Sequence, residues 1–237
     1  MIDIHCHILP EIDDGAIDMD DTLSMASLAA ECGVSAIVAT PHCNIPGAPS
    51  NYFDDYLKKL IAKTRQTLAN EKIPIKLLTG MEVYVTFDLP DLIKQGKILT
   101  INQSRYLLVE FNFGEDPEFV EVMVDRLKEL KIIPVIAHPE RYEFVKFNTD
   151  FATILKKKGC VLQSNKGSFL GRYGSSTRDT AFELLRSGVI SVVASDAHNC
   201  TVRTPYMTEA KRTLEPYCDV NKLFSLNPRK ICTNRIL

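Results

Sequence analysis

The sequence has no run of about 20 apolar residues, the length a helix needs to span a bilayer. It also has no basic stretch followed by an apolar one at its start. We therefore expect neither a transmembrane segment nor a signal peptide. Charge of one sign is scarce as well, since 28 lysine and arginine residues stand against 30 aspartate and glutamate residues. A net charge of −2 gives no basic surface for nucleic acid or an anionic membrane, which argues against both as partners.

The seven cysteines show no C-x-x-C spacing and no paired clusters. Reduced thiols in a cytoplasmic protein are the simplest interpretation. There is no glycine-rich loop with a lysine, and so no P-loop for nucleotide phosphates. No internal repeat, low-complexity tract or flexible linker divides the chain. We therefore expect one domain over residues 1–237.

Short apolar runs rich in β-forming residues alternate with stretches of helical periodicity. The seven expected strands cover 1–7, 35–42, 75–84, 105–112, 132–140, 160–166 and 190–199. The expected helices cover 22–32, 51–71, 119–131, 151–159 and 180–188. The strands are continuously apolar, which indicates burial on both faces. The alternation predicts an α/β fold, a parallel sheet covered by helices that is either open or closed into a barrel.

All histidines of the chain lie at or just beyond the carboxyl end of an expected strand. They are His5, His7, His42, His138 and His198. In parallel α/β folds active sites form at that edge, because the strand ends and the following loops converge there. A single histidine in such a place is more often structural, but five of five indicate a shared function.

Four acidic residues occupy the same edge: Asp14, Glu82, Glu110 and Asp196. An unpaired buried carboxylate is costly, and a bound cation compensates its charge. His5 and His7 project from one face of a strand and could hold one ion together, whereas Cys6 points to the other face. Imidazole with carboxylate is the ligand set of Zn, Mn or Fe rather than of Ca or Mg alone. The pattern therefore predicts a metal centre.

Seven short motifs carry a resemblance to a known family. They are HCH (5–7), DDG (13–15), TPH (40–42), GMEVY (80–84), VEF (109–111), IAHPERY (136–142) and ASDAHN (194–199). The chain resembles the PHP (polymerase and histidinol phosphatase) superfamily almost from end to end. Within it, the manganese-dependent bacterial tyrosine-protein phosphatases of the CpsB/YwqE type are the most similar. The resemblance implies a distorted seven-stranded (β/α) barrel of the PHP type, similar to a TIM barrel.

The resemblance also implies three divalent metal ions, Mn²⁺ in the first place, with Fe and Zn as alternatives. The first ion would be held by His5, His7, Glu82 and Asp196. The second would be held by Glu82, as a bridge, together with Glu110 and His138. The third would be held by Asp14, His42 and His198. By the same resemblance, two arginines grip the phosphate of the substrate with their planar guanidinium groups: Arg141 and Arg203.

The mechanism expected from these residues is attack of a metal-activated hydroxide on phosphorus, without a covalent enzyme intermediate. No residue offers itself as a general acid, but a phenolate leaving group, with a pKa near 10, needs less help than an alkoxide. Gln163, Asn165 and Ser168 lie at the end of the expected strand 160–166. They could line the pocket or cap the loop, and we keep them as candidates for residues that support the ligands without binding metal themselves.

The expected substrate is the phosphotyrosine of a bacterial tyrosine kinase that controls capsule or exopolysaccharide synthesis, an assignment that rests on the resemblance alone. One alternative is a small-molecule phosphatase such as histidinol phosphatase, which shares the metal ligands. Another is a non-catalytic metal-binding scaffold. The GMEVY and HPERY motifs favour the tyrosine phosphatase over the first alternative, and a full ligand set with two arginines argues against the second.

Two other phosphatase chemistries fit the sequence poorly. Cysteine-based tyrosine phosphatases need an arginine six residues after the thiolate, and no cysteine of this chain has one. The segment DMDDT (18–22) matches the D-x-D-x-T pattern of aspartyl-phosphate enzymes, but no apolar strand precedes it. We interpret it as an acidic loop that leads into a helix.

Overall fold

The computed structural model describes residues 1–237, and its strands form two sheets. The three-stranded sheet contains, in order, β1 (Ile2–Cys6), β2 (Ala36–Ala39) and β4 (Lys76–Thr79). The six-stranded sheet contains, in order, β3 (His42–Cys43), β5 (Glu82–Tyr84), β6 (Tyr106–Glu110), β7 (Ile133–Ala137), β8 (Val161–Asn165) and β9 (Val192–Ala194). Every strand pairing is parallel. The predicted α/β class with parallel strands is confirmed.

The distorted seven-stranded (β/α) barrel implied by the resemblance is not confirmed, because the structure has nine strands in two sheets that do not close into a barrel. Two of the expected strands are interrupted. Thr40 and Pro41 separate β2 from β3, and Gly80 and Met81 separate β4 from β5. Pro41 has no N–H group to donate to a strand ladder. The first half of each interrupted strand stays with β1, and the second half pairs within the six-stranded sheet.

Near their carboxyl ends the two sheets meet at β1 and β9. An isolated bridge joins Cys6 to Ala197. The backbone N–H of His7 donates to the Ala197 oxygen at 2.8 Å, and that of Asp196 donates to the His5 oxygen at 2.9 Å. Residues from opposite ends of the chain are thereby held side by side.

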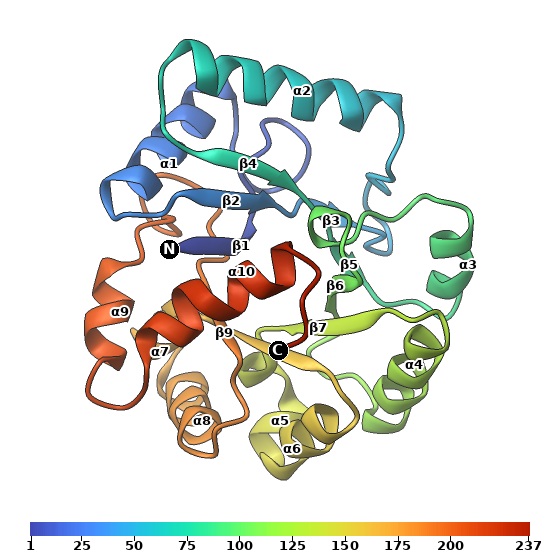
Figure 1. The fold of residues 1–237 in the computed structure, drawn as a ribbon. Coiled ribbons are helices and arrows are strands. Elements are labelled where there is room, and N and C mark those ends of the chain that lie inside the picture. The colour runs from blue at the N-terminus through green and yellow to red at the C-terminus, as the bar shows by residue number, and fades with distance from the viewer.

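Ten α-helices surround the strands (Figure 1). They are α1 (Met19–Glu31), α2 (Asp55–Asn70), α3 (Leu89–Lys94), α4 (Pro117–Glu129), α5 (Glu143–Phe147), α6 (Asp150–Lys157), α7 (Lys166–Phe169), α8 (Ser175–Arg186), α9 (Thr208–Leu214) and α10 (Asn227–Cys232). The helices predicted from the sequence correspond to α1, α2, α4, α6 and α8. None of the ten is long and apolar enough to cross a bilayer.

The acidic segment before α1 has the structure expected of it. Asp18 is the N-cap of the helix, and its carboxylate accepts a hydrogen bond from the Asp21 backbone N–H at 2.8 Å. Such a cap satisfies one of the free N–H groups at a helix start. The DMDDT segment therefore starts a helix, as predicted.

The inner faces of the strands change from apolar to polar along their length. Tyr106 and Leu108 of β6 belong to a cluster of 14 buried hydrophobic residues. Since strand side chains alternate, the next residue on that face is Glu110. In β8, Val161 of the same cluster is followed on its face by Gln163 and Asn165, both fully buried. The apolar cluster thus supports a layer of buried polar groups at the carboxyl ends of the strands.

Candidate metal centre

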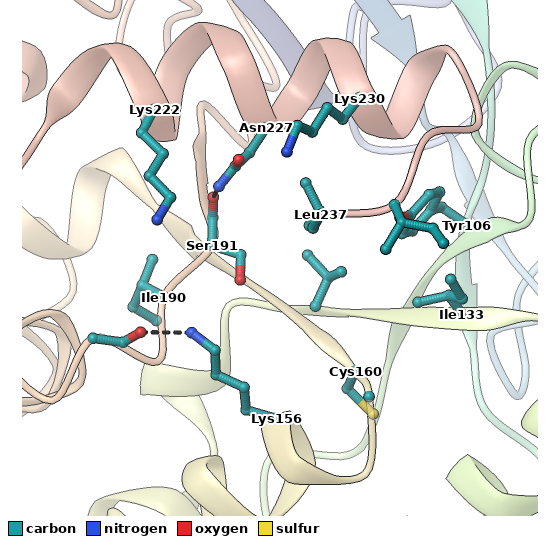
Figure 2. A pocket seen from close by; sticks show the side chains of 14 residues that line it. Tyr106, Ile133, Lys156, Cys160, Ile190, Ser191, Lys222, Asn227, Lys230 and Leu237 are labelled. Atoms are coloured by element: carbon teal, nitrogen blue, oxygen red, sulfur yellow. Dashed lines mark hydrogen bonds between the residues drawn. The ribbon is translucent and has the colours of Figure 1, made fainter.

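Two cavities lie at opposite ends of the strands and differ in chemistry. The cavity at the amino ends, about 520 Å³, is lined by three lysines and has no histidine or acidic residue among its 14 lining residues (Figure 2). The cavity at the carboxyl ends, about 340 Å³, is lined by histidines, carboxylates and both predicted arginines. The groups that could ligate a metal and bind phosphate are therefore gathered at the carboxyl ends, as the sequence predicted.

Glu82 is the central carboxylate of this cluster. It is buried at the start of β5. Its Oε2 atom lies 3.1 Å from His5 Nε2, 3.2 Å from His7 Nε2 and 3.1 Å from His42 Nδ1. Its other oxygen, Oε1, lies 3.0 Å from His138 Nε2. Strand register contributes directly, because His42 of β3 stands opposite Glu82 in the parallel ladder.

The predicted ligands form three groups, in each of which the potential ligand atoms lie within 4.8 Å of one another. The first group is the set expected for the first ion: His5, His7, Glu82 and Asp196. The second contains His42, Glu82 and Glu110. The third contains His7, Asp14, His42 and His198. Two groups differ from the ligand sets expected for the second and third ions. His42 is an additional member of the second group, and His7 is an additional member of the third.

His138 is the one predicted ligand outside these groups, yet it faces the same cavity. Its Nε2 lies 3.0 Å from a Glu82 oxygen and 3.8 Å from Glu110 Oε2. All nine predicted ligands are thus brought together. His138 and Asp196 both have left-handed backbone, with φ of 34° and 49°. Such conformations are costly for residues with a Cβ and gather at functional sites, where they direct side chains.

The cluster fits divalent cations. Four of its buried atoms form no hydrogen bond, even though Glu82 Oε2 lies only 3.1 Å from His42 Nδ1: His42 Nδ1, Glu82 Oε2, His138 Nδ1 and His198 Nε2. Buried polar atoms nearly always form hydrogen bonds, so four buried polar atoms without one need an explanation. The His7 and His198 rings also lie with centroids only 3.9 Å apart. Cations that accept lone pairs from imidazole and carboxylate would satisfy these atoms, and the donor set suits Mn, Fe or Zn.

In the metal-free protein, the close approach of imidazoles and carboxylates shifts the pKa values of His7 and Glu82. Burial lowers the pKa of His7, but the neighbouring carboxylates of Asp13, Asp196 and Glu82 outweigh burial and hold that pKa well above its ordinary value. Burial raises the pKa of Glu82, but the charge of His5 and the neighbouring imidazoles of His138 and His7 outweigh burial and hold that pKa well below its ordinary value. The lowered pKa keeps Glu82 ionised, and the raised pKa of His7 favours an imidazolium beside it. Metal binding to such a site releases protons.

Asp13 is a residue of the site that the sequence analysis missed. Its Oδ2 accepts hydrogen bonds from His7 Nδ1 and from the His42 backbone N–H, both at 2.8 Å. A carboxylate on the second nitrogen of a ligating histidine fixes the ring and raises its basicity. Its neighbour Asp14 instead reaches His42 Nε2 and His198 Nε2, at 3.4 Å each. The indication in the sequence was the pair of adjacent aspartates in the DDG motif. In the structure the two aspartates have different partners.

Gln163 and Asn165 hold two predicted ligands from behind. Gln163 Oε1 accepts a hydrogen bond from His5 Nδ1 at 2.8 Å, and its amide nitrogen donates to Asn165 Oδ1 at 2.9 Å. The Asn165 amide in turn donates to Asp196 Oδ2. Both residues are fully buried and do not line the cavity. They contact ligands from behind, which is the supporting role that the sequence analysis kept open for them.

Ser168 has a different partner, a buried glutamate that the sequence analysis also missed. Its hydroxyl donates to Glu140 Oε1 at 2.6 Å. The same oxygen accepts the Asn165 backbone N–H at 2.8 Å. Glu140 therefore anchors the start of α7 beneath the cluster, and Ser168 touches no predicted ligand directly.

The variant Gln163→Leu tests the support of His5. It leaves His5 Nδ1 without an acceptor, so the ring loses its fixed orientation. Loss of such an outer partner typically lowers metal affinity about 10- to 100-fold, and we expect that loss when the metal-free protein is titrated with Mn²⁺ by calorimetry. Ser168→Ala is the matched control and should stay within about twofold of the wild type, because it touches no ligand. Unchanged affinity in Gln163→Leu would show that the amide only fills space.

Both predicted arginines lie beside the cluster and line the cavity. Arg203 Nη2 is 2.8 Å from Asp196 Oδ2, and Arg141 Nη1 is 3.7 Å from the same oxygen. Two guanidinium groups thus approach the cluster from different loops. Their remaining N–H groups can bind the oxygens of a phosphate placed against it.

A metal-dependent hydrolase built on parallel strands is the class of protein that this fold and this cluster define. Within that class, residues 1–233 match the family described as capsular polysaccharide synthesis, CpsB/CapC. The chain belongs to this family, and the resemblance found in the sequence is confirmed.

Curated relatives and solved structures agree with this assignment. The tyrosine-protein phosphatase YwqE of Bacillus subtilis is 36% identical over 221 residues, which cover 91% of this chain and 84% of that protein. The tyrosine-protein phosphatase CpsB of Streptococcus pneumoniae is 30% identical over the full length of both proteins. A crystal structure from work on YwqE and CpsB, described as unique metal-dependent tyrosine phosphatases, matches with a TM-score of 0.92. That match has 33% identity and covers 99% of this chain and 95% of the other.

Proposed function

We propose that this chain is a metal-dependent protein-tyrosine phosphatase. The observation that carries the proposal is the convergence of four imidazoles on the two oxygens of Glu82, beside two arginines that approach Asp196. Relatives at 30–36% identity bear the name tyrosine-protein phosphatase. Residues 1–237 would act as one domain.

Three divalent ions would be held by the residues brought together at the carboxyl ends of the strands, and manganese is the proposed metal. His5, His7, Glu82 and Asp196 would hold the first. Glu82, Glu110 and His138 would hold the second, with His42 within reach. Asp14, His42 and His198 would hold the third. When bound, the ions supply a hydroxide nucleophile near neutral pH and neutralise the phosphoryl oxygens.

The chain itself contributes binding and orientation. Arg203 and Arg141 would bind the phosphoryl oxygens and align phosphorus for in-line attack. Asp196 orients both guanidinium groups through its Oδ2 atom. Seven of the nine proposed ligands are buried, all but Asp14 and His42, and burial strengthens the electrostatic interactions there. A tyrosine phenolate, with a pKa near 10, can leave without a dedicated general acid.

The proposed partner is a phosphotyrosine-bearing bacterial tyrosine kinase involved in capsule or exopolysaccharide synthesis. Support comes from the CpsB/CapC family description and from the names of the relatives. The seven cysteines form no disulfide, and a cytoplasmic location stays a prediction.

A substrate comparison separates this function from the two alternatives. For the manganese-loaded protein, we expect kcat/KM for a phosphotyrosine peptide to exceed that for histidinol phosphate by about 100-fold. The reverse preference would establish a small-molecule phosphatase. Metal binding without hydrolysis of either ester would establish a scaffold.

A further inference from the structure

Phe113 is an exposed aromatic residue at the edge of the cavity that contains the ligand cluster. It follows β6 and lines the cavity with Glu110 and His138. Its side chain is 42% exposed, whereas Phe111, two residues earlier, is buried. Ligand pockets combine a few convergent polar groups with aromatic or apolar walls. Phe113 supplies such a wall beside a site that is otherwise charged.

The position of Phe113 is fixed by its backbone and its neighbours. Its carbonyl oxygen accepts a hydrogen bond from the Glu143 N–H at 2.8 Å. The N–H of Gly114 donates to Asn112 Oδ1 at 3.0 Å, which closes the turn. The Phe113 ring centroid lies 6.0 Å from that of His138. A side chain already held in place loses little further freedom when a ligand packs against it.

Arg141 connects Phe113 to the groups proposed to bind phosphate. Its guanidinium carbon lies 4.5 Å from the centroid of the Phe113 ring and 4.7 Å from that of the Tyr173 ring. These are cation–π contacts, which orient the guanidinium group. The same group reaches to 3.7 Å from Asp196. The Arg141 guanidinium group therefore contacts the Phe113 ring and also borders the place where a phosphoryl group would bind.

Tyr173 and Phe113 share this contact with Arg141 but differ in access to the substrate. Phe113 lines the cavity, and Tyr173 does not. Both can position Arg141, but of the two only Phe113 forms part of the cavity wall. This difference makes Tyr173 a natural control.

We propose that Phe113 recognises the aromatic ring of the substrate, so that the site selects aryl phosphates over alkyl phosphates. The inference rests on the proposed function and names the part of the substrate that is selected. In an aryl phosphate the ring begins at the ester oxygen, so the ring and the phosphoryl group are held close together. Phe113 and Arg141 have the same arrangement, an aromatic surface directly beside a phosphate-binding group. An alkyl phosphate has only a methylene group at that position and cannot form an aromatic pair.

Phenylphosphonate and methylphosphonate test the inference, because neither is hydrolysed and they differ only in the ring. We expect the manganese-loaded wild type to bind phenylphosphonate more tightly, as measured by calorimetry and by inhibition of phosphotyrosine peptide hydrolysis. Phe113→Leu should weaken phenylphosphonate binding about tenfold, or ~1.4 kcal/mol, and methylphosphonate binding by less than about twofold. Phe113→Tyr keeps the ring and should keep the preference.

Tyr173→Leu is the matched control. It removes the other ring on Arg141 but no cavity surface, so both phosphonates should weaken by the same factor. Equal weakening of both by Phe113→Leu would overturn the inference, since Phe113 would then act only through Arg141. An unchanged preference in Phe113→Leu, with the thermal midpoint showing a folded protein, would overturn it as well. Failure of the wild type to hydrolyse a phosphotyrosine peptide would instead contradict the proposed function, whatever these ratios are.

Discussion

Dialysis against a chelator is expected to lower phosphotyrosine hydrolysis by about 10³-fold or more, and added Mn²⁺ should restore it. The reason is chemical. Free water has a pKa of about 15.7, and a bound divalent ion lowers that pKa to about 7, which makes hydroxide available at neutral pH. No side chain at the cavity can replace that nucleophile, because the candidate bases are the proposed ligands themselves. Initial rates before dialysis, after dialysis and after Mn²⁺ addition measure the effect.

Thiol alkylation is the control for this experiment and should leave most of the activity. Burial raises the pKa of the Cys43, Cys160 and Cys232 thiols to about 12. Since the thiolate is the reactive form, these residues are poor nucleophiles at neutral pH. Cys6, within the HCH motif, is fully buried and has a pKa well above its ordinary value for the same reason. Loss of activity on alkylation, with full activity retained after chelation, would refute the metal mechanism.

Glu82→Gln is expected to reduce turnover by about 10³-fold or more and to lower the number of bound ions. Glu82 is within 3.2 Å of four imidazoles, more than any other proposed ligand. An amide keeps the shape but removes the negative charge that would bridge two cations, and it offers one oxygen where the carboxylate offers two. Steady-state kinetics and metal analysis of the purified variant measure both effects.

Glu140→Gln is a matched control for burial. Glu140 is as buried as Glu82, yet its bonded oxygen accepts only from Asn165 and Ser168. The amide oxygen of glutamine can accept the same bonds, so we expect a loss of less than about tenfold in turnover and unchanged metal content. If Glu140→Gln and Glu82→Gln lost equal activity, the effect of Glu82 would come from disturbing a buried site and not from ligation.

Much of the fold could be predicted because its signals are local. Continuous apolar runs mark strands buried on both faces, and the segments between them show helical periodicity. Whether the strands close into a barrel could not be predicted in this way, because the interruptions at Pro41 and Gly80 decide which sheet each half of an interrupted strand joins. A Cβ on Gly80 would lie only 2.7 Å from Val38 Cγ1. That close approach is a tertiary contact, and no pattern around Gly80 in the sequence reveals it.

The proposed histidine ligands could be found because the chain has only five histidines and all of them lie at strand ends. The proposed carboxylate ligands could be found because they share that place. The supporting residues could not be found in this way. Asp13 and Glu140 are common residue types whose roles depend on which group faces them. The DDG motif shows the difference, since Asp13 supports His7, Asp14 faces two other imidazoles, and Gly15 is needed for space. A Cβ on Gly15 would lie 2.2 Å from the His7 carbonyl oxygen. The pair of rings that holds Arg141 is similarly hidden, because Phe113 and Tyr173 are far apart in the chain.

Anomalous diffraction from crystals grown with Mn²⁺ is the most direct test of the central claim, that distant segments of this chain meet to bind several cations. We expect three anomalous peaks at the carboxyl ends of the strands, with Glu82 between the first and the second and with His42 and His198 at the third. Imidazoles that point away from one another around a cavity without anomalous density would contradict the claim.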